Sequence, residues 1–306
     1  MQCTNQHYSY QLKGVVFMNK ANQLVINYHI TEKCNYDCHY CYAKWAKPNE
    51  LHRNVDEVKR VLSKLAEYFL SPNPIQQQLQ YQSVRLNFAG GEPLLLKQRL
   101  IDALDFAIEL GFETSIITNG HLISDEFIAK HSHKLQLLGV SYDACRYEVQ
   151  KQIGRITRSG NVLSVERLQS IFKQVKRHSP STKLKINTVV NQFNSEEDFT
   201  GVMASLQPDK WKVLRVLPVF DSIQTISDQQ FESFIERHQS LVHCMSAENN
   251  DSMTNSYLML SPDGAFFQNG NGSSGYFKSR PLLTTPIDVA LAESGFDAIK
   301  FAQRYH

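Results

Sequence analysis

Three cysteines occur close together in the sequence CNYDCHYC. Cys34, Cys38 and Cys41 have the spacing C-x3-C-x2-C, and an expected strand at residues 24–30 leads into them. Clustered thiolates are typical ligands of iron–sulfur clusters, and a four-iron cluster ordinarily takes four of them. Three cysteines therefore predict a [4Fe–4S] cluster with one iron left open, and an open iron can bind a small molecule.

Two other uses of these cysteines have to be weighed. Zinc also binds closely spaced cysteines, and His39 could be a fourth ligand. A structural zinc site usually draws on two separated ligand pairs, however, and the remaining cysteines are scattered along the chain. A disulfide is disfavoured because nothing marks the chain as secreted. We therefore favour the iron–sulfur cluster.

The composition excludes several function classes. The chain has 306 residues, enough for one large α/β domain, and a formal net charge of +2, which gives no global basic field for nucleic acid. No run approaches the ~18 apolar residues of a membrane span. The first residues lack the pattern of a signal peptide. We expect a cytoplasmic protein with neither nucleic acid nor membrane as a partner.

Strand-like and helix-like stretches alternate along the chain. We expect strands at 24–30, 84–88, 113–118, 136–141, 183–190 and 211–217. We expect helices at 54–70, 97–110, 124–132, 163–178, 195–206 and 227–242. Residues 71–80 and 269–277 are expected to be loops, the second alternatively a lid. Six β-α units predict a parallel sheet with right-handed crossovers, as a six-unit open barrel or a doubly wound sheet.

Loops after the expected strands carry further candidate residues, because chemistry collects at the carboxyl ends of parallel strands. Gly90, Gly91, Glu92 and Pro93 follow the second strand. Glycines let the backbone approach a ligand closely, and the Glu92 carboxylate could accept a hydrogen bond from an ammonium group. The other interpretation is a tight turn before a helix.

Several expected strands carry polar residues on one face, since residues i and i+2 of a strand share a side. The polar sets are Asn27 and His29; Arg85 and Asn87; Lys183, Lys185 and Asn187; Lys210 and Lys212. The alternating residues on the opposite face are largely apolar, as in Leu184 and Ile186. Helices cover the outer face of a βα barrel, so the polar residues of each strand should face inward.

Inward-facing cations predict an anionic ligand, because unpaired buried lysines are costly or lose their charge. Several converging cations favour a ligand with several negative charges, and phosphate groups are the natural candidate. For Lys183 and Lys210, a solvated position at the strand end is an equally good interpretation.

The cysteine loop and the Gly-Gly-Glu-Pro string together resemble the radical S-adenosylmethionine (SAM) superfamily. In that superfamily the open iron chelates the amino and carboxylate groups of SAM. One electron from the cluster then releases a 5′-deoxyadenosyl radical. The resemblance implies a partial (βα)6 TIM-like barrel at 24–242. A lead-in at 1–23 would precede it, and a C-terminal extension at 243–306 would close the active site.

Longer segments resemble the viperins, a family of antiviral nucleotide-modifying enzymes. They include NYHITEKCNYDCHYC, RLNFAGGEPLL, ITNGHLI, KINTVVNQFNSEED and WKVLRVLP, and the resemblance spans roughly residues 24–300. It implies conversion of a ribonucleoside triphosphate, often CTP, to its 3′-deoxy-3′,4′-didehydro form. The steps would be C4′ hydrogen abstraction, loss of the 3′-hydroxyl as water, and uptake of one electron and one proton.

The viperin resemblance also implies roles position by position. Cys34, Cys38 and Cys41 match the cluster ligands. The positions that match SAM contacts are Tyr40, Tyr42, Gly90, Gly91, Glu92, Ser141, Arg155 and Asn187. The positions that match nucleotide contacts are Asn27, Arg85, Asn87, Lys185, Lys210 and Lys212. Tyr257 matches a tyrosine proposed to act in radical quenching, although a packed strand tyrosine is an equal alternative.

This chain departs from the animal viperins in two places. Where this chain has Arg85 and Lys210, the animal viperins have Lys and Arg, respectively. The exchange keeps the charge at both positions but changes the geometry of the contacts. A basic C-terminal loop is replaced by QNGNGSSGYFKSR, in which Lys278 or Arg280 could supply charge over the phosphates. The resemblance further implies a flavodoxin- or ferredoxin-type electron donor. Rival hypotheses are a radical SAM enzyme acting on another phosphorylated molecule or a peptide, and a non-enzymatic iron–sulfur or zinc protein.

Overall fold

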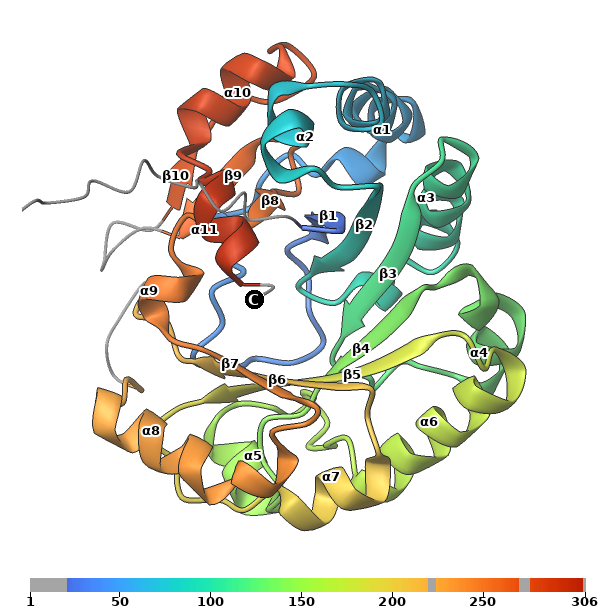
Figure 1. Ribbon diagram of the computed structural model, residues 1–306. Helices are drawn as coiled ribbons and strands as arrows, with labels where there is room; N and C mark the ends of the chain where they lie inside the picture. Colours follow the sequence, from blue (N-terminus) through green and yellow to red (C-terminus); the bar gives the residue numbers. More distant parts are fainter. Residues whose placement is uncertain (1–20, 220–223, 270–275, 305–306) are drawn as a thin grey trace, which may run out of the picture.

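Strand β1 (Gln23–Thr31) lies inside the sheet, with parallel partners on both sides. The computed structural model describes residues 21–219, 224–269 and 276–304, and its strands form one curled sheet with helices outside it (Figure 1). The expected partial barrel is confirmed. The order of strands across the sheet is β10-β9-β8-β1-β2-β3-β4-β5-β6-β7.

Strands β1 to β7 are parallel and neighbour one another in chain order. After β1 the parallel strands are β2 (Ser83–Gly90), β3 (Glu113–Thr118), β4 (Leu137–Ser141), β5 (Lys183–Val190), β6 (Lys210–Arg215) and β7 (Met245–Glu248). Six of these seven strands were expected. Short β7 was missed, because four residues give too little alternation to identify a strand.

The remaining strands lie on the other side of β1. Strand β8 (Leu258–Leu260) pairs with β1 in parallel, and β9 (Phe266–Asn269) and β10 (Tyr276–Lys278) follow antiparallel. The described sheet is therefore open, with β7 and β10 as its edges. We call the place where the residues just before β8 face β7 the seam. Part of the expected loop at 269–277 is thus strand; residues 270–275 lie outside the described residues, as do residues 1–20 of the expected lead-in.

Helices cover the outer face of the sheet (Figure 1). The α-helices are α1 (Val55–Phe69), α2 (Pro74–Leu79), α3 (Gln98–Glu109), α4 (Asp125–His131), α5 (Tyr147–Gln152), α6 (Val165–His178), α7 (Thr200–Leu206), α8 (Asp228–Arg237), α9 (Asn250–Met253), α10 (Ile287–Ser294) and α11 (Ala298–Gln303). The 3-10 helices are η1 (Leu51–Arg53), η2 (Pro93–Leu96), η3 (Ser132–Lys134) and η4 (Gln239–Leu241).

Helix α2 corrects the expectation of a loop at 71–80. The Asn73 side chain accepts a hydrogen bond from the Gln76 N–H and so caps the helix. Pro74 occupies the first turn, where its missing N–H costs nothing. The residues that suggested a loop therefore start a helix. Helix α7 also begins later than expected, at Thr200.

The apolar parity of the strands packs against the helices, as expected. Leu184, Ile186, Trp211 and Val213 are at most 1% exposed and belong to the main hydrophobic core. Removing such side chains from water is the main force that holds a βα barrel together. The polar parity of β5 and β6 consequently faces the inside of the barrel.

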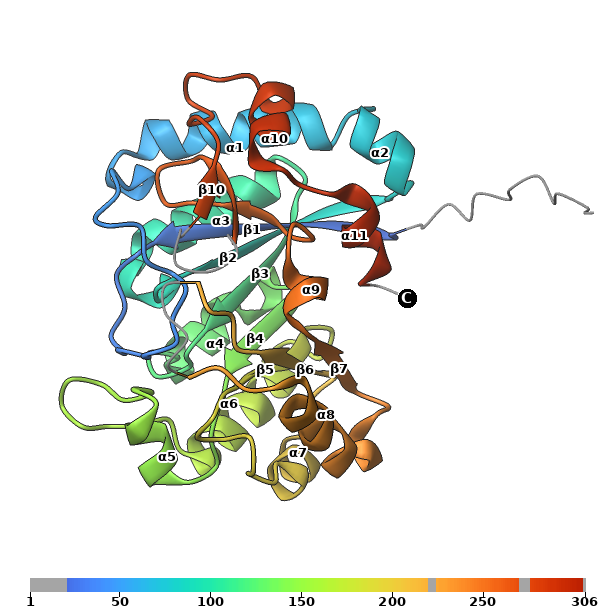
Figure 2. The same cartoon turned by 90° about the vertical axis from the view of Figure 1, so that its left-hand side faces the viewer.

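The two ends of the barrel carry different segments (Figure 2). The cysteine loop, which follows β1, extends beyond the carboxyl ends of the parallel strands, whereas α11 lies toward their amino ends. Within the described residues, no helix combines the length and the apolarity needed to cross a membrane.

Candidate active site

The three cysteines line one cavity at the carboxyl ends of the strands. Residues from the loops after β1, β2, β3 and β4 and from β5 and β6 share its wall, including Gly91, Asn119, Ser141 and Asn187. Its empty volume is about 1010 Å³, part of it open to solvent. The structure therefore brings the cysteine loop and the loops after the next three strands together at one cavity.

Donor groups surround the sulfur atoms. The Tyr36 N–H lies 3.4 Å from the Cys34 sulfur, Asn119 Nδ2 lies 3.8 Å from it, and Arg155 Nη1 lies 3.8 Å from the Cys38 sulfur. Burial raises the pKa of the Cys34 thiol to about 11 and that of Cys38 to about 12. Ligation requires thiolates, and these donors stabilise thiolate charge.

This donor set fits three irons of a four-iron cluster. Hydrogen bonds to cluster sulfurs are part of how a protein tunes such a cluster. In the described part of the chain, no group of three or more His, Cys, Asp or Glu side chains is arranged to hold a single metal ion. His39, the candidate fourth zinc ligand, is exposed.

The two glycines bring the cysteine loop and β2 into contact. The Gly91 N–H donates to the Thr31 carbonyl at 2.7 Å, and the Glu92 N–H donates to the Lys33 carbonyl at 2.8 Å. A Cβ on Gly91 would stand 2.3 Å from the Lys33 oxygen, and one on Gly90 would stand 2.4 Å from the Thr31 oxygen. The cysteine loop can therefore dock this closely on β2 only because residues 90 and 91 have no side chain.

Glu92 lies behind the cavity wall and is fully buried. Its carboxylate accepts hydrogen bonds from the Thr118 hydroxyl, the Asn119 N–H and the Leu94 N–H, at 2.8, 2.8 and 3.0 Å. Burial raises its pKa, although these donors oppose the shift. A carboxylate has about four acceptor positions, so one remains for a further donor such as an ammonium group.

Arg155 is a buried cation beside Cys38. Its guanidinium lies 2.9 Å from Asp143 and donates to the Ser141 carbonyl at 2.6 Å. Asp143 also accepts a hydrogen bond from the Tyr40 hydroxyl at 2.6 Å. Burial lowers the pKa of Arg155, but the interactions with Asp143 and with Tyr40, Cys38 and Tyr36 together outweigh burial and raise the arginine pKa above its usual value. The sequence predicted Arg155, Ser141 and Tyr40; it placed Asp143 in the loop after the fourth strand but gave no role to this residue, which contacts both Arg155 and Tyr40.

Aromatic side chains form another part of the cavity wall. The His29 ring contacts the edges of Tyr42, Trp45 and Phe267, with centroids 5.2–5.6 Å apart. Burial lowers the pKa of His29 to about 3, so the imidazole is neutral. The His29 Nδ1 atom and the Asn187 side-chain oxygen are both buried without a hydrogen-bond partner.

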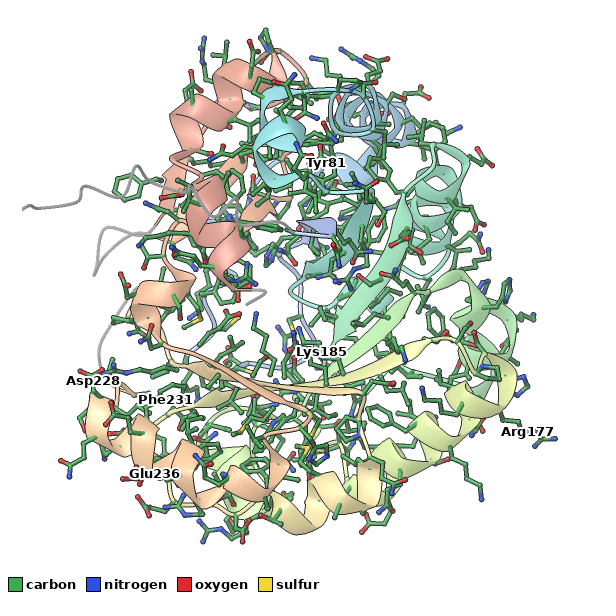
Figure 3. The ribbon with its side chains drawn as sticks, in the orientation of Figure 1. Tyr81, Arg177, Lys185, Asp228, Phe231 and Glu236 are labelled. Carbon is green, nitrogen blue, oxygen red and sulfur yellow. The ribbon has the colours of Figure 1, made fainter. Side chains whose placement is uncertain are left out.

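Basic side chains gather deeper in the barrel. Lys185 projects from β5 into the barrel interior (Figure 3), and burial followed by repulsion from Lys212, Lys210 and Arg85 lowers its pKa strongly. Arg304 lies close enough to Lys212 and Lys210 to lower their pKa values as well. We call these five side chains the inner basic cluster: Arg85, Lys185, Lys210, Lys212 and Arg304.

A chain of amide and hydroxyl groups lies nearby. Asn87 donates to the Asn27 side-chain oxygen at 2.9 Å and accepts from the Ser115 hydroxyl at 2.6 Å. Arg85 donates to the Gln23 side chain at 2.8 Å. Asn27, Arg85 and Asn87 thus lie on the inner face of β1 and β2, the face that the alternation of polar residues predicts.

Tyr257 and Glu248 meet at the seam. The Tyr257 hydroxyl donates to Glu248, and Lys212 Nζ lies 2.6 Å from the phenol oxygen. The Arg304 guanidinium lies 3.5 Å from the centre of the Tyr257 ring. The sequence predicted Tyr257 and Lys212. It missed Glu248 and Arg304, because one acid in a short strand and one arginine after the last helix carry no spacing signal.

The structure does not bring Lys278 to the inner basic cluster. Lys278 is exposed on β10, and its ammonium pairs with Asp263 at 2.5 Å. Arg280 pairs with Glu293 instead. Arg304 supplies a cation to the cluster from the C-terminal segment.

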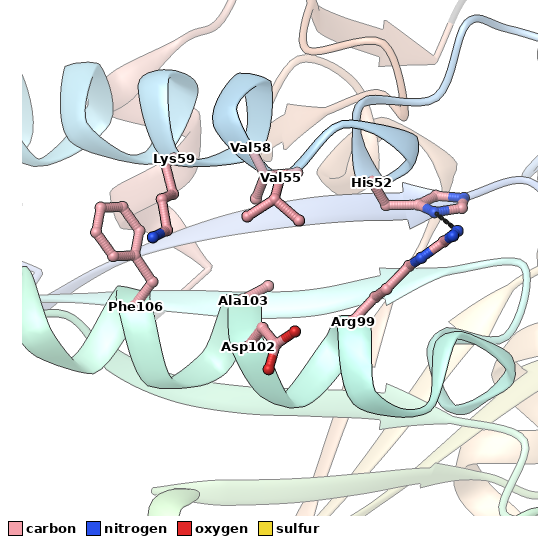
Figure 4. Close-up of a pocket in the computed structure, with 8 residues that line it drawn as sticks. All are labelled: His52, Val55, Val58, Lys59, Arg99, Asp102, Ala103 and Phe106. Atoms are coloured by element: carbon pink, nitrogen blue, oxygen red, sulfur yellow. Dashed lines mark hydrogen bonds between the residues drawn. The ribbon is translucent and has the colours of Figure 1, made fainter.

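Another pocket lies outside the barrel, between α1 and α3 (Figure 4). Lys59 stands over the Phe106 ring, with its ammonium 5.3 Å from the centroid, and His52 Nδ1 lies 3.5 Å from Arg99. This pocket contains none of the cysteines, and we assign no chemistry to it.

Comparison with known proteins agrees with this geometry. The profile of the Radical SAM superfamily matches residues 28–204. An S-adenosylmethionine-dependent nucleotide dehydratase of Pseudoalteromonas ulvae is 44% identical over 293 residues, covering 95% of each chain. The chain belongs to the S-adenosylmethionine-dependent nucleotide dehydratases of the radical SAM superfamily. The resemblance to viperins is thereby confirmed.

Other members of the dehydratase family are more distant. One from Fibrobacter sp. is 39% identical, covering 92% of this chain and 88% of its own, and one from Danio rerio is 31% identical, covering 91% and 76%. Radical SAM enzymes use a [4Fe–4S] cluster and SAM, and the cysteine loop and cavity described above fit both.

Solved structures share the fold of this dehydratase family member. The anSMEcpe protein with bound AdoMet has a TM-score of 0.62 at 12% identity, covering 92% of this chain and 82% of its own. SuiB of Streptococcus suis bound to S-adenosylmethionine has a TM-score of 0.58 at 13% identity, covering 92% and 65%.

Proposed function

We propose that the protein converts a ribonucleoside triphosphate to its 3′-deoxy-3′,4′-didehydro form, with CTP favoured and UTP and GTP as alternatives. Such a product terminates viral RNA chains. The observation that carries the proposal is the inner basic cluster. Five cations converge inside a barrel, and a ligand with several negative charges satisfies them better than water does.

The cysteines and their donors hold the cofactors in this proposal. Cys34, Cys38 and Cys41 would hold three irons and leave the fourth open to SAM. The bound cofactors would supply one electron for SAM cleavage and a 5′-deoxyadenosyl radical for abstraction of the C4′ hydrogen. Arg155 stays charged beside Cys38, so it can neutralise the carboxylate of SAM and the cluster thiolates together.

Other cavity residues position SAM. Glu92 has an acceptor position left for the SAM ammonium, and Gly90 and Gly91 keep the cysteine loop within reach of it. Tyr40 and Tyr42 would contact the adenine. Ser141 and Asn187, which line the cavity wall, would contact the ribose. In each case the side chain supplies binding and orientation.

The inner basic cluster holds the triphosphate, while Asn27 and Asn87 lie at the ribose or base. Lys185 regains its charge when phosphate replaces water around it. The 3′-hydroxyl leaves as water with one proton, and one electron from a flavodoxin- or ferredoxin-type donor reduces the remaining nucleotide radical to the product. We assign Tyr257, which contacts Lys212 in the cluster, to this quenching step.

The test is an anaerobic incubation of reconstituted protein with SAM, a reductant and equal amounts of CTP, UTP, GTP and ATP. Mass spectrometry should show loss of water from at least one nucleotide, with CTP the most altered, and nucleotide should stimulate 5′-deoxyadenosine formation. Cys38→Ala should abolish both. The matched control is Cys145→Ala, which changes a free cysteine outside the cavity wall. If no nucleotide changes mass or stimulates SAM cleavage, the substrate class is wrong.

A further inference from the structure

An acid lies among the cations of the inner basic cluster. Glu248, on β7, is 7% exposed, and its carboxylate contacts Lys212, Arg304 and Tyr257. An anion at this place is unexpected in a site that is built for phosphate, because it repels the ligand that the cations attract. The contacts of the Glu248 carboxylate indicate what an acid does in this cluster.

The two carboxylate oxygens of Glu248 have different partners. Oε1 lies 2.5 Å from Lys212 Nζ and 3.2 Å from Arg304 Nε. Oε2 accepts the hydrogen of the Tyr257 hydroxyl. The phenol oxygen in turn accepts from Lys212 at 2.6 Å. The Glu248 carboxylate therefore orients both cations through Oε1 and the phenol through Oε2.

These contacts also join the two edges of the seam. Glu248 belongs to the edge strand β7, whereas Tyr257 immediately precedes β8, which is not hydrogen-bonded to β7. Arg304, just after α11, reaches the same carboxylate and also donates to the Ser256 carbonyl at 2.8 Å. Residues of β7, α9 and α11 line a crevice at this place.

We propose that Glu248 is a positioning residue that fixes the Tyr257 hydroxyl and the cations Lys212 and Arg304 across the seam, at the expense of triphosphate affinity. The inference rests on the proposed nucleotide substrate and deepens it. A purely structural residue would change the affinity for triphosphate and the yield of product per SAM cleaved in the same direction. A positioning residue of this kind would change them in opposite directions.

Glu248→Gln is the informative substitution, because glutamine keeps the shape but has one acceptor oxygen. If that oxygen faces Lys212 and Arg304, the amide NH2 faces the phenol, whose hydrogen loses its acceptor. The lost negative charge removes the repulsion of phosphate. We expect triphosphate to bind roughly tenfold tighter, about 1.4 kcal/mol. We also expect kcat to fall roughly tenfold, with more 5′-deoxyadenosine released per nucleotide product.

The binding arm uses the reconstituted protein without SAM or reductant, so that it cannot turn over, titrated with CTP and with inorganic tripolyphosphate. The turnover arm compares 5′-deoxyadenosine with dehydrated nucleotide. Glu196→Gln is the matched control, since Glu196 is a 77%-exposed acid paired with Arg237 on the outer surface. Tyr257→Phe should reproduce the excess of 5′-deoxyadenosine without the tighter binding.

Tighter binding together with a lower kcat supports the assignment. Binding and kcat that fall in proportion, or that match Glu196→Gln, would overturn it. A Tyr257→Phe protein that retains normal coupling of SAM cleavage to product would also overturn it. Should wild-type protein bind neither CTP nor tripolyphosphate, the proposed function itself fails, and that result is distinct from the others.

Discussion

The contact between the cysteine loop and the Gly90–Gly91 turn gives the sharpest steric prediction. We consider Gly91→Ala. The new Cβ would stand 2.3 Å from the Lys33 oxygen and 2.4 Å from the Glu32 oxygen, whereas real Cβ contacts essentially never fall below 3.0 Å. Both obstacles are backbone atoms, so no flexible side chain can yield. The loop has to move by at least the missing 0.7 Å.

This displacement breaks or lengthens two hydrogen bonds that dock the loop. The Gly91 N–H to Thr31 bond is 2.7 Å long and the Glu92 N–H to Lys33 bond is 2.8 Å long. Each is worth about 1 kcal/mol net. A loss of about 2 kcal/mol shifts the local equilibrium of the docked loop roughly 30-fold. Because Cys34 directly follows Lys33, cluster assembly should suffer more than overall folding.

The assay is anaerobic reconstitution followed by measurement of iron and sulfide per chain and of visible absorbance. Thermal unfolding of the cluster-free protein reports on overall folding. Gly201→Ala is the matched control, because Gly201 lies in α7 and its Cβ would meet no atom within 4 Å. That variant should bind iron normally. A Gly91→Ala protein that holds as much iron as Gly201→Ala would refute the reasoning.

Three further predictions concern buried charges. Lys185→Met should stabilise the ligand-free protein, because it removes the cost of burying an amine among other cations, yet weaken CTP binding roughly 10- to 150-fold, equivalent to ~1.5–3 kcal/mol. Thermal unfolding measures the gain in stability and binding titrations measure the loss of affinity; a loss of both would contradict the prediction. Burial and repulsion from Arg304 lower the pKa of Lys212 to about 7 from 10.5. Between these values the unfolded chain holds a proton that the folded chain lacks, so this group adds stability as pH rises while CTP binding weakens; Lys212→Arg should flatten the pH dependence of binding, and an unchanged profile would exclude Lys212 as its source. Asp143→Asn leaves Arg155 buried beside an uncharged partner and should cost about 3–5 kcal/mol in chemical denaturation; a loss under about 1 kcal/mol would show that the pair is not effectively buried.

The sequence was informative wherever a residue was repeated or spaced in a regular way. Alternation along the expected strand at 183–190 predicts Leu184 and Ile186 against the helices and Lys185 inside the barrel, which is where the structure places them. The cysteine spacing identified the loop, and the expected order of strands placed it beside the Gly90–Gly91 turn. These signals are local or follow from the topology of parallel sheets.

The sequence was uninformative where a contact joins isolated residues that are far apart in the chain. Glu248, Arg304 and Asp143 are single charges whose importance comes from the partners that folding brings to them. Conversely, Lys278 looked suitable by position, but Asp263 pairs with it on the outside. The Gly90–Gly91 turn was expected to make room for a ligand, whereas in this structure the backbone it admits belongs to the cysteine loop.

The seam has a consequence for how this scaffold can change. Between the paired strands of the described sheet, main-chain hydrogen bonds set the spacing. At the seam, the distance between the two sides depends on a few side chains, such as Glu248, Tyr257 and Arg304. Exchanging them would resize the chamber without disturbing the ten-stranded framework, so related chains could accommodate cargo of different bulk while keeping the same metal-binding end.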